Sequence, residues 1–382
     1  MLRKARAKEG EQGPGAKQRL PDRSQERAGT GQSEETHLAQ FHDRLQRKQD
    51  AMIITRTPFR ISFFGGGTDF PLWYQEQGGA VISTTIDKYC YVSCRQLPPF
   101  FEFKHKLTFF SKSEAFNDID EIQHPAVREV YRFMNVRDGL IMQHDADLPS
   151  HSGLGSSSCF TVGLLHALYS LRGQTVTKKR LALEAVNIEQ NMIREAVGSQ
   201  DQIAAAFGGL NKISFSRHNN IEVTPIPIRG EKLQHLQSSL MLFFTGFQRF
   251  AVEIEKDKIT NIEKRHSELK AMHCLVDSAM EILNGDISQY DDFGRLLHET
   301  WLLKKTLSDK VSTDHIDDIY KRAMGSGALG GKILGAGGGG FILFYVQPHR
   351  QQKVREALSD LLHVPFRFDT LGSQLIYYTE DH

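Results

Sequence analysis

The chain has few cysteines and no long apolar run. Four cysteines among 382 residues are too few for a disulfide scaffold and are typical of a protein from a reducing compartment. No apolar run reaches the roughly 20 residues that a membrane-spanning helix needs. The N-terminal segment also lacks the apolar stretch of a signal peptide. We therefore expect a cytoplasmic protein with no membrane partner.

The chain also has no excess of charge of either sign. It carries 47 basic and 46 acidic residues, so its formal net charge is +1. Without a basic excess, no nucleic-acid partner is expected. Cys90 and Cys94 are not spaced as zinc ligands, and we interpret them as buried thiols. An apolar content of 40% and a charged content of 24% are those of a globular protein.

Composition divides the chain into three parts. Residues 1–51 are rich in Lys, Arg, Glu, Gln and Gly and poor in aliphatic residues, which predicts a disordered extension. The stretch Pro225–Lys232, rich in Pro, Gly and charge, predicts a boundary. We therefore expect an N-terminal domain over 52–230 and a C-terminal domain over 231–382. Predicted strands cluster instead of alternating with helices, which indicates an α+β fold.

The periodicity predicts most elements of these two domains. The expected helices are Pro71–Gln77, His124–Met134, Ser156–Leu171, Thr177–Glu195, Ser199–Phe207, a broken one over Ala251–Leu283, Asp292–Thr306, Thr313–Gly325 and His349–Leu362. The expected strands are Met52–Thr57, Arg60–Phe64 after a turn at Pro58, Ala80–Ile86, Tyr89–Gln96, Leu107–Phe110, Gly139–Asp145, Leu210–Ser216, Ile221–Ile226, Ser239–Phe244, Lys332–Leu334, Phe341–Val346, Pro365–Asp369 and Gln374–Tyr378.

One Gly/Ser turn between a predicted strand and a predicted helix is typical of a phosphate site. Its residues run Ser152-Gly153-Leu154-Gly155-Ser156-Ser157-Ser158. Backbone N–H groups and the macrodipole at a helix N-terminus attract anions. The glycines allow close approach of the backbone, and the serines supply caps and hydroxyls. An ordinary capped helix would not need three consecutive serines, so we interpret the turn as an ATP-binding loop.

Other glycine-rich strings fit other motifs less well. Gly335-x-Gly337-x-x-Gly340 matches a dinucleotide fingerprint, but the apolar run that follows predicts a strand where the fingerprint needs a helix. Gly331-Lys332 lacks the remainder of a Walker A loop. Asp292-Phe293-Gly294 occurs without the other protein-kinase motifs and within a predicted helix.

Charged candidates accompany the glycine-rich elements. Glu189 lies on a predicted helix, and Asp201 falls in the first turn of another helix, which Ser199 can cap. Arg60 precedes the run Gly65–Asp69. Each has an ordinary structural interpretation by itself. Together with the loop they provide a phosphate cradle, a carboxylate for Mg²⁺, a second carboxylate for the nucleophile and a cation, as phosphoryl transfer requires.

Three motifs in this order resemble the GHMP kinase superfamily: Pro58–Asp69, Pro149–Ser158 and Leu334–Phe341. The stretches Thr55–Phe70, Thr84–Cys90, Gln123–Glu129 and Val197–Gln202 further resemble its D-glycero-D-manno-heptose 7-phosphate 1-kinases. The resemblance covers about residues 52–380. It implies an N-terminal domain like domain 2 of ribosomal protein S5 and a ferredoxin-like C-terminal domain. It also implies an ATP-dependent kinase that supplies nucleotide-activated heptose for polysaccharide.

The resemblance also implies roles for residues. Asp201 and Arg60 would be catalytic, Ser157 and Glu189 would hold Mg²⁺, and ATP would lie on Ser152–Ser158. The sugar-binding residues would be Gly66, Gly67, Thr68, Asp69, Gly337 and Gly338. The partners would be ATP and a small sugar phosphate, with the chain a monomer or homodimer. The candidates for binding a 7-phosphate are Lys88, Arg95, Lys104, Lys106 and Arg249.

Two alternatives stay open at this point. One is a kinase of the same superfamily for fucose, galactose or an octose phosphate. The other is a sugar-binding regulator without catalysis, against which the intact Asp201, Glu189 and Ser157 argue. A mevalonate kinase would need a site for a carboxylate-bearing chain, and no such site is apparent in the sequence.

Overall fold

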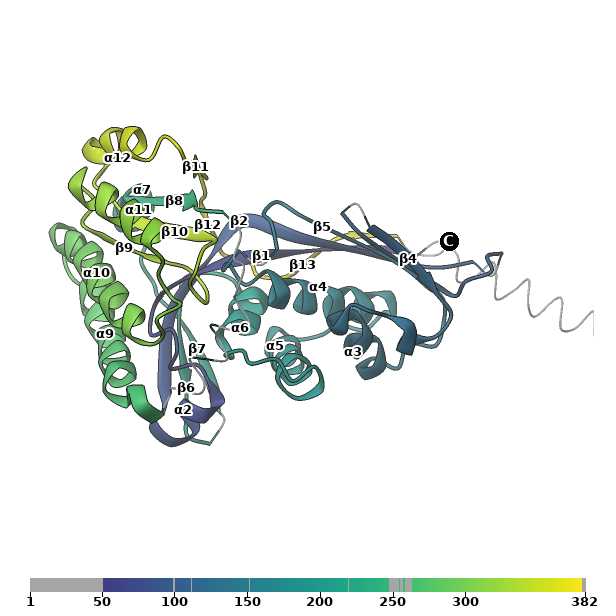
Figure 1. Cartoon of the computed structure of the whole chain (residues 1–382). Helices are drawn as coiled ribbons and strands as arrows, with labels where there is room; N and C mark the ends of the chain where they lie inside the picture. The colour runs from purple at the N-terminus through teal and green to yellow at the C-terminus, as the bar shows by residue number, and fades with distance from the viewer. Residues whose placement is uncertain are drawn as a thin grey trace, which may run out of the picture. The chain divides into compact units, whose positions relative to one another are not determined.

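A computed structural model of the chain describes residues 51–98, 100–110, 112–150, 152–218, 220–246, 254, 257 and 263–379 (Figure 1). The chain divides into two units, residues 1–48 and 49–382, and the described residues belong to the second. The expected disordered extension, apart from Ala51, therefore lies outside the described residues. Arg249 and much of the helix expected before His266 also lie outside them. Within the described part, no helix combines the length and apolarity needed to cross a bilayer.

A large mixed sheet is built around two long antiparallel strands, β1 (Met52–Phe64) and β2 (Gly79–Gln96). In the described residues it has nine strands, and its main path runs β13 (Gln374–Tyr378), β1, β2, β5 (Leu140–Ala146), β3 (His105–Phe109) and β4 (Lys112–Phe116). β6 (Asn211–Phe215) and β12 (Phe368–Asp369) pair with β2, and β7 (Ile221–Pro225) pairs with β6.

Helices α3 (Pro125–Phe133), α4 (Ser156–Leu171), α5 (Lys178–Asn187) and α6 (Gln200–Phe207) lie together on one side of this sheet (Figure 1). Helix α4 packs directly against β1 and β2 and is buried on nearly every side. Its approach depends on Gly163, where an added Cβ would lie 2.9 Å from Thr57 Oγ1. Gly163 O also accepts a hydrogen bond of 2.9 Å from Thr55 Oγ1. The helix that begins at the Ser/Gly loop is thereby fixed to the central strands.

A second, antiparallel sheet lies after residue 238. It has the order β11 (Leu362–His363), β8 (Leu240–Phe244), β10 (Phe341–Tyr345) and β9 (Gly330–Ile333). Around it are α7 (Glu231–Ser238), α9 (His266–Asn284), α10 (Tyr290–Thr306), α11 (Asp314–Gly325) and α12 (Gln351–Ala357). Phe293 of α10 packs edge-on against Phe63 and Phe64 of β1, with ring centroids 5.3 Å and 4.9 Å apart. One apolar core thus joins the two sheets.

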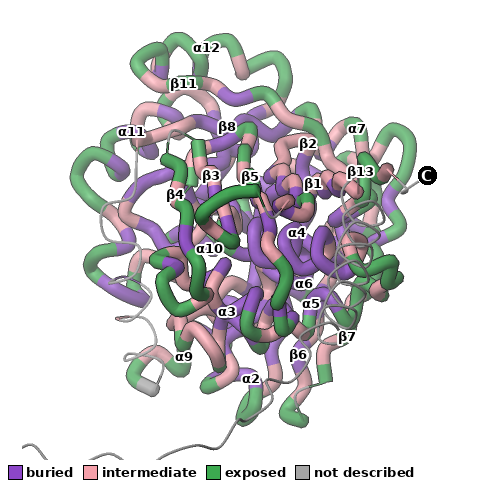
Figure 2. The backbone as a smooth tube through the Cα atoms, turned by 90° about the vertical axis from the view of Figure 1, so that its right-hand side faces the viewer, coloured by how far each residue is buried: buried purple, intermediate pink, exposed green. Residues whose placement is uncertain are grey.

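Burial follows the same arrangement. Figure 2 shows that α4, α6 and α10 contain many of the buried residues, whereas the residues of β4 and α12 are mainly exposed. Short helix α2 (Pro71–Gln77) follows the first glycine run and coincides with its prediction.

The expected turn at Pro58 is wrong, because β1 is continuous through it. The register with β2 shifts between Pro58 and Arg60, and such an irregularity accommodates a residue that has no N–H to donate. The expected break between Ile86 and Tyr89 is also wrong, because β2 is continuous from Gly79 to Gln96. Both strands are long because each pairs with different partners along its length.

Other differences concern short elements and helix ends. The sequence did not predict β4, α7 or β11, and the expected helix Thr177–Glu195 ends as α-helix at Asn187. Ile188–Met192 then forms a π-helix that carries Glu189. The division at residue 230 stays a prediction, with one complication: β12 and β13 return to pair with β2 and β1.

Candidate active site

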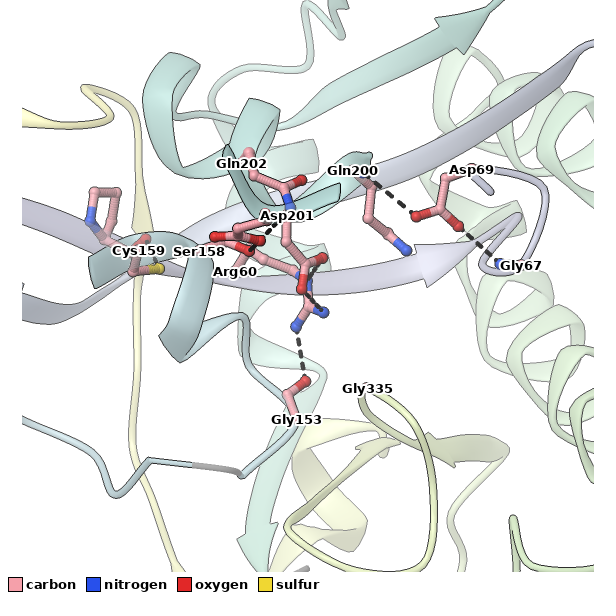
Figure 3. A network of polar contacts seen from close by, with 12 residues as sticks. Arg60, Gly67, Asp69, Gly153, Ser158, Cys159, Gln200, Asp201, Gln202 and Gly335 are labelled. Atoms are coloured by element: carbon pink, nitrogen blue, oxygen red, sulfur yellow. Dashed lines mark hydrogen bonds and ion pairs between the residues drawn. The ribbon is translucent and has the colours of Figure 1, made fainter. Parts of the chain in front are cut away.

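Arg60 and Asp201 form the central ion pair of the site (Figure 3). Arg60 Nε donates to Asp201 Oδ1 and Arg60 Nη2 donates to Oδ2, each over 2.7 Å. Arg60 Nη1 donates to Gly153 O over 2.7 Å, and its main-chain N–H donates to Leu154 O over 3.1 Å. One buried arginine of β1 therefore fixes both the carboxylate in the first turn of α6 and the Ser/Gly loop.

The Ser/Gly loop leads directly into α4, as the sequence predicted. Gly155 is the N-cap of α4 and has a left-handed backbone conformation (φ +79°). Ser156, Ser157 and Ser158 occupy the first turn of the helix, whose N–H groups receive no hydrogen bond from a capping side chain. An added Cβ at Gly155 would lie 3.2 Å from Arg60 Cγ and 3.3 Å from Asp201 Oδ2. The first-turn N–H groups of a long helix thus lie beside the ion pair, as an anion site requires.

The third glycine-rich motif packs against this loop. A Cβ at Gly335 would lie 2.4 Å from Gly153 Cα, and one at Gly340 would lie 2.3 Å from Ser152 O. Phe341 N donates to Ser152 O over 3.2 Å, so the contact is also hydrogen-bonded. Strands β9 and β10 flank the motif, which agrees with its rejection as a dinucleotide fingerprint.

Asp69 connects the first motif to the loop before α6. Its Oδ1 accepts from Gly67 N over 2.9 Å and its Oδ2 accepts from Gln200 N over 3.4 Å. A Cβ at Gly198 would lie only 1.9 Å from Asp69 Oδ2, so a larger residue there would displace the carboxylate. Figure 3 shows Asp69 and Gln200 close together, beside the Arg60–Asp201 pair.

A cavity of about 110 Å³ joins these groups. Its lining includes the expected residues Arg60, Gly66, Gly67, Asp69, Ser158 and Asp201. It also includes residues that were not among the expected site residues: Ser62, Phe70, Val197, Gly198, Gln200, Gln202, Met272, Lys304, Leu307, Lys332 and Gly335.

Three expected sugar-binding residues lie elsewhere. Thr68 is fully buried, and its hydroxyl proton is shared between Gly65 O, at 2.8 Å, and Ala80 O, at 3.0 Å. Gly337 and Gly338 pack against Val311: a Cβ at Gly337 would lie 2.8 Å from Val311 Cα, and Gly338 N donates to Val311 O over 2.8 Å. Their observed contacts support a structural role in the turn and the glycine-rich motif.

Lys304 and Lys332 are the most important residues that the sequence interpretation missed. The sequence analysis gave Lys304 no role, yet this residue continues the buried stripe of Phe293, Leu297 and Trp301 at helical spacing. That spacing was the available signal. Lys332 was noted only as part of a failed Walker A match.

Glu189 is buried behind the cavity. Its Oε2 accepts hydrogen bonds from Ser158 Oγ, over 2.9 Å, and from Gln202 Nε2, whereas its Oε1 has no partner in the part of the chain that the structure describes. Burial raises the pKa of the Glu189 carboxyl to about 7, although the hydrogen bonds from Gln202 and Ser158 oppose the rise. A cation beside it would satisfy the unpartnered oxygen and favour the ionised form.

The expected Mg²⁺ ligands are only partly brought together. Ser158, and not Ser157, contacts Glu189, and Ser157 is exposed. The described residues contain no group of three His, Cys, Asp or Glu side chains that could hold a metal. One carboxylate and a serine hydroxyl still suit Mg²⁺, because this ion often keeps water and substrate phosphates among its ligands.

A second, aromatic cavity lies beside the start of α4. It has a volume of about 80 Å³ and is lined by Phe59, Cys90, Phe110, His124, His144, Ala146, Leu148, Ser150, Ser156, Ser157 and Phe160. Burial lowers the pKa of His144 to about 4, so its ring is neutral near pH 7. An apolar cavity next to a helix N-terminus suits the base of a nucleotide.

The remaining expectations concern Ser199 and the phosphate-binding cations. Ser199 is the N-cap of α6 but makes no side-chain cap, because its hydroxyl contacts Tyr74 and Gln190. The candidate cations Lys88, Arg95, Lys104 and Lys106 do not line the cavity at the ion pair.

Comparisons with known proteins agree with this geometry. A model described as "GHMP kinases N terminal domain" matches residues 122–209, and one described as "GHMP kinases C terminal" matches residues 281–364. The D-glycero-alpha-D-manno-heptose 7-phosphate kinase of Campylobacter jejuni is 31% identical over 315 residues, which are 80% of this chain and 93% of that protein.

Solved structures share the fold. A structure titled D-glycero-D-manno-heptose 1-phosphate kinase from Bacteriodes thetaiotaomicron has a TM-score of 0.68 and 24% identity, covering 85% of this chain and 99% of its own. A putative sugar kinase from Campylobacter jejuni has a TM-score of 0.64 and 26% identity, covering 86% and 98%.

The chain belongs to the GHMP kinase family. It is an ATP-dependent sugar kinase, and the α+β fold of this family that the sequence predicted is confirmed.

Proposed function

We propose that the chain transfers the γ-phosphoryl group of ATP to the anomeric C1 hydroxyl of D-glycero-D-manno-heptose 7-phosphate. The observation that carries the proposal is the Arg60–Asp201 pair, which borders both the ATP loop and the cavity. The choice of acceptor is supported by the relative named a heptose 7-phosphate kinase, of which this chain covers 93%.

In this proposal Asp201 orients the attacking hydroxyl and accepts its proton. The bidentate contact with Arg60 leaves the carboxylate few orientations, and positioning contributes much of the rate in phosphoryl transfer. Arg60 also lies against Gly153 of the loop, where its charge would stabilise the transferring group.

ATP would place its phosphates at the N-terminus of α4 and its base in the aromatic cavity. Both sites border Ser156 and Ser157, so a single nucleotide can reach both. Asp69, with the backbone of Gly66 and Gly67, would bind hydroxyls of the sugar, since all three line the cavity next to Asp201.

Glu189 and a serine of the α4 first turn would hold Mg²⁺. When bound, this ion neutralises charge on the nucleotide phosphates. The buried carboxylate oxygen without a partner among the described residues supports the assignment. The family resemblance implies Ser157 as the serine that binds Mg²⁺, whereas Ser158 is the serine whose hydroxyl contacts Glu189.

The test is release of ADP with Mg-ATP and a panel of acceptors. The panel contains heptose 7-phosphate, heptose 1-phosphate, fucose, galactose and mevalonate, with Asp201→Asn as the blank. Turnover confined to heptose 7-phosphate, with the new phosphate at C1 by phosphorus NMR, supports the proposal. Preference for another acceptor would reject the substrate and keep the kinase, and absence of turnover with every sugar phosphate would reject the proposal.

A further inference from the structure

Two buried lysines line the cavity from the side of the second sheet. Lys304 of α10 is 6% exposed and Lys332 of β9 is 3% exposed. Lys304 Nζ donates to Ile333 O over 2.8 Å and to Gly335 O over 2.6 Å, and Lys332 Nζ donates to Phe63 O over 2.8 Å. These main-chain contacts hold each ammonium group in a fixed position at the cavity wall.

Ser62 adds a hydroxyl to the same cavity. It precedes Phe63, whose carbonyl accepts from Lys332, and it lines the same cavity. Ser62 is 6% exposed, and its Oγ has no hydrogen-bond partner within the described residues. A buried hydroxyl without a partner is costly, and a ligand oxygen in the cavity would satisfy it.

The charges of the cavity favour an anion at this wall. Its ionisable residues are three basic ones (Arg60, Lys304, Lys332) and two acidic ones (Asp69, Asp201). Arg60 and Asp201 form an ion pair, so the other ionisable residues of the lining are two lysines and one aspartate. An ammonium group in a low-dielectric site is stabilised by a ligand of opposite charge, and lysine commonly binds phosphate as a point charge.

We propose that Lys304, Lys332 and Ser62 form a phosphate-binding subsite for the phosphate group that the acceptor sugar already carries. This inference rests on the proposed function and identifies the residues that would make the enzyme select a phosphorylated acceptor. The subsite and Asp201 line one cavity, so one sugar phosphate can contact both.

The lysines could instead bind the phosphoryl group that ATP transfers. Lys304 contacts Gly335, and Gly335 packs on the Ser/Gly loop, where we propose that ATP binds. The two sources predict different kinetics. Loss of a contact with the acceptor's own phosphate lowers kcat/KM for the phosphorylated acceptor alone. Loss of a contact with the transferring group lowers kcat with every acceptor.

The experiment compares kcat/KM for heptose 7-phosphate and for unphosphorylated heptose in wild type, Lys304→Gln and Ser62→Ala. We expect the preference for the phosphorylated acceptor to fall about 10- to 100-fold in Lys304→Gln and about 3- to 10-fold in Ser62→Ala. Ser62→Ala removes a hydroxyl without an internal partner, so it should fold even if Lys304→Gln does not. Lys305→Gln is the matched control, because Lys305 lies on the same helix and pairs with exposed Asp317.

An equal loss with both acceptors, or an unchanged preference in Ser62→Ala and Lys304→Gln, would overturn the subsite. If wild type turns over neither acceptor, the proposed function fails, and the subsite is then tested by calorimetric binding of heptose 7-phosphate without nucleotide. Weaker binding to Ser62→Ala than to wild type would support the subsite, and equal binding would overturn it.

Discussion

Ser158 Oγ donates a 2.9 Å hydrogen bond to Glu189 Oε2 from the last position of the first turn of α4. Ser158 also lines the cavity, whereas Glu189 is 1% exposed. The hydroxyl therefore lies between the cavity and a carboxylate that the family resemblance assigns to Mg²⁺. Neighbouring Ser157 is exposed.

This relationship separates the two serines experimentally. Ser158→Ala removes a buried hydrogen-bond donor and should lower the free energy of unfolding by about 1–2 kcal/mol. Ser157→Ala should leave stability nearly unchanged and raise the Mg²⁺ concentration for half-maximal activity. Urea denaturation and a Mg²⁺ titration measure the two effects, and a raised Mg²⁺ requirement in Ser158→Ala alone would reassign the metal to Ser158.

Asp201→Asn should lower kcat by about 10²–10⁴-fold, the usual contribution of a positioned general base. The amide keeps the size of the side chain, and binding of ATP, which we propose to lie on Ser152–Ser158, should change little. Single-turnover kinetics and nucleotide titration measure the two effects. The matched control is Asp277→Asn, which disrupts an exposed ion pair with Lys212 far along the chain. Turnover like that of wild type would remove Asp201 from the mechanism.

Gly335→Ala tests the contact between the third motif and the Ser/Gly loop, on which we propose that ATP binds. Gly335 has φ +67°, and an added Cβ would meet Gly153 Cα at 2.4 Å. Gly173 has nearly the same φ, +66°, with no atom within 4 Å of the added Cβ. Both alanines should experience backbone strain of about 1–2 kcal/mol, but only Gly335→Ala should also raise KM for ATP. Equal KM values for the two variants would show that the contact does not position the loop.

Stability should fall in mild acid through His105. Burial lowers the pKa of this histidine to about 4, below its value near 6.5 in an unfolded chain. The unfolded state thus binds the proton more readily, and stability present above pH 6.5 is lost as the pH falls toward 4. Between pH 7 and pH 5 the loss should be about 1–2 kcal/mol.

The variant that isolates this effect is His105→Asn. Its amide oxygen can replace Nδ1, which accepts from Leu140 N over 3.3 Å, and it does not titrate. Denaturant unfolding at pH 7 and pH 5 should show a smaller difference for the variant. A difference as large as that of wild type would assign the acid sensitivity to other groups.

The sequence predicted local features of the site well. Gly155 and the serines after it begin α4, and Asp201 lies in the first turn of α6. Each of these features is local to one helix start, so spacing alone indicated a phosphate loop and a first-turn carboxylate. Arg60, 141 residues before Asp201, was associated with it through the motif pattern, and their pairing is a tertiary contact.

Features that depend on distant partners were not predicted. Pro58 indicated a turn because its missing N–H is costly in a regular ladder, but a shift of register between β1 and β2 accommodates it. Lys304 is a residue type that is common on helix surfaces, but its ammonium group donates to the carbonyls of Ile333 and Gly335, which are distant in sequence. Thr68 suggested sugar recognition, yet Ala80 lies close enough to bind its hydroxyl. Such contacts follow from packing and leave little trace in local spacing.

The return of β13 to the edge of β1 has a consequence for biosynthesis. Thr55 and Arg56, a few residues before Arg60, pair with Leu375 and Gln374, which lie more than 300 residues later in the chain. A ribosome produces the first strand long before its neighbour, so the sheet stays incomplete during almost the whole of translation. The nascent chain therefore exposes an unpaired strand edge near Arg60 until residues 374–378 emerge, and chaperones have that interval in which to protect it.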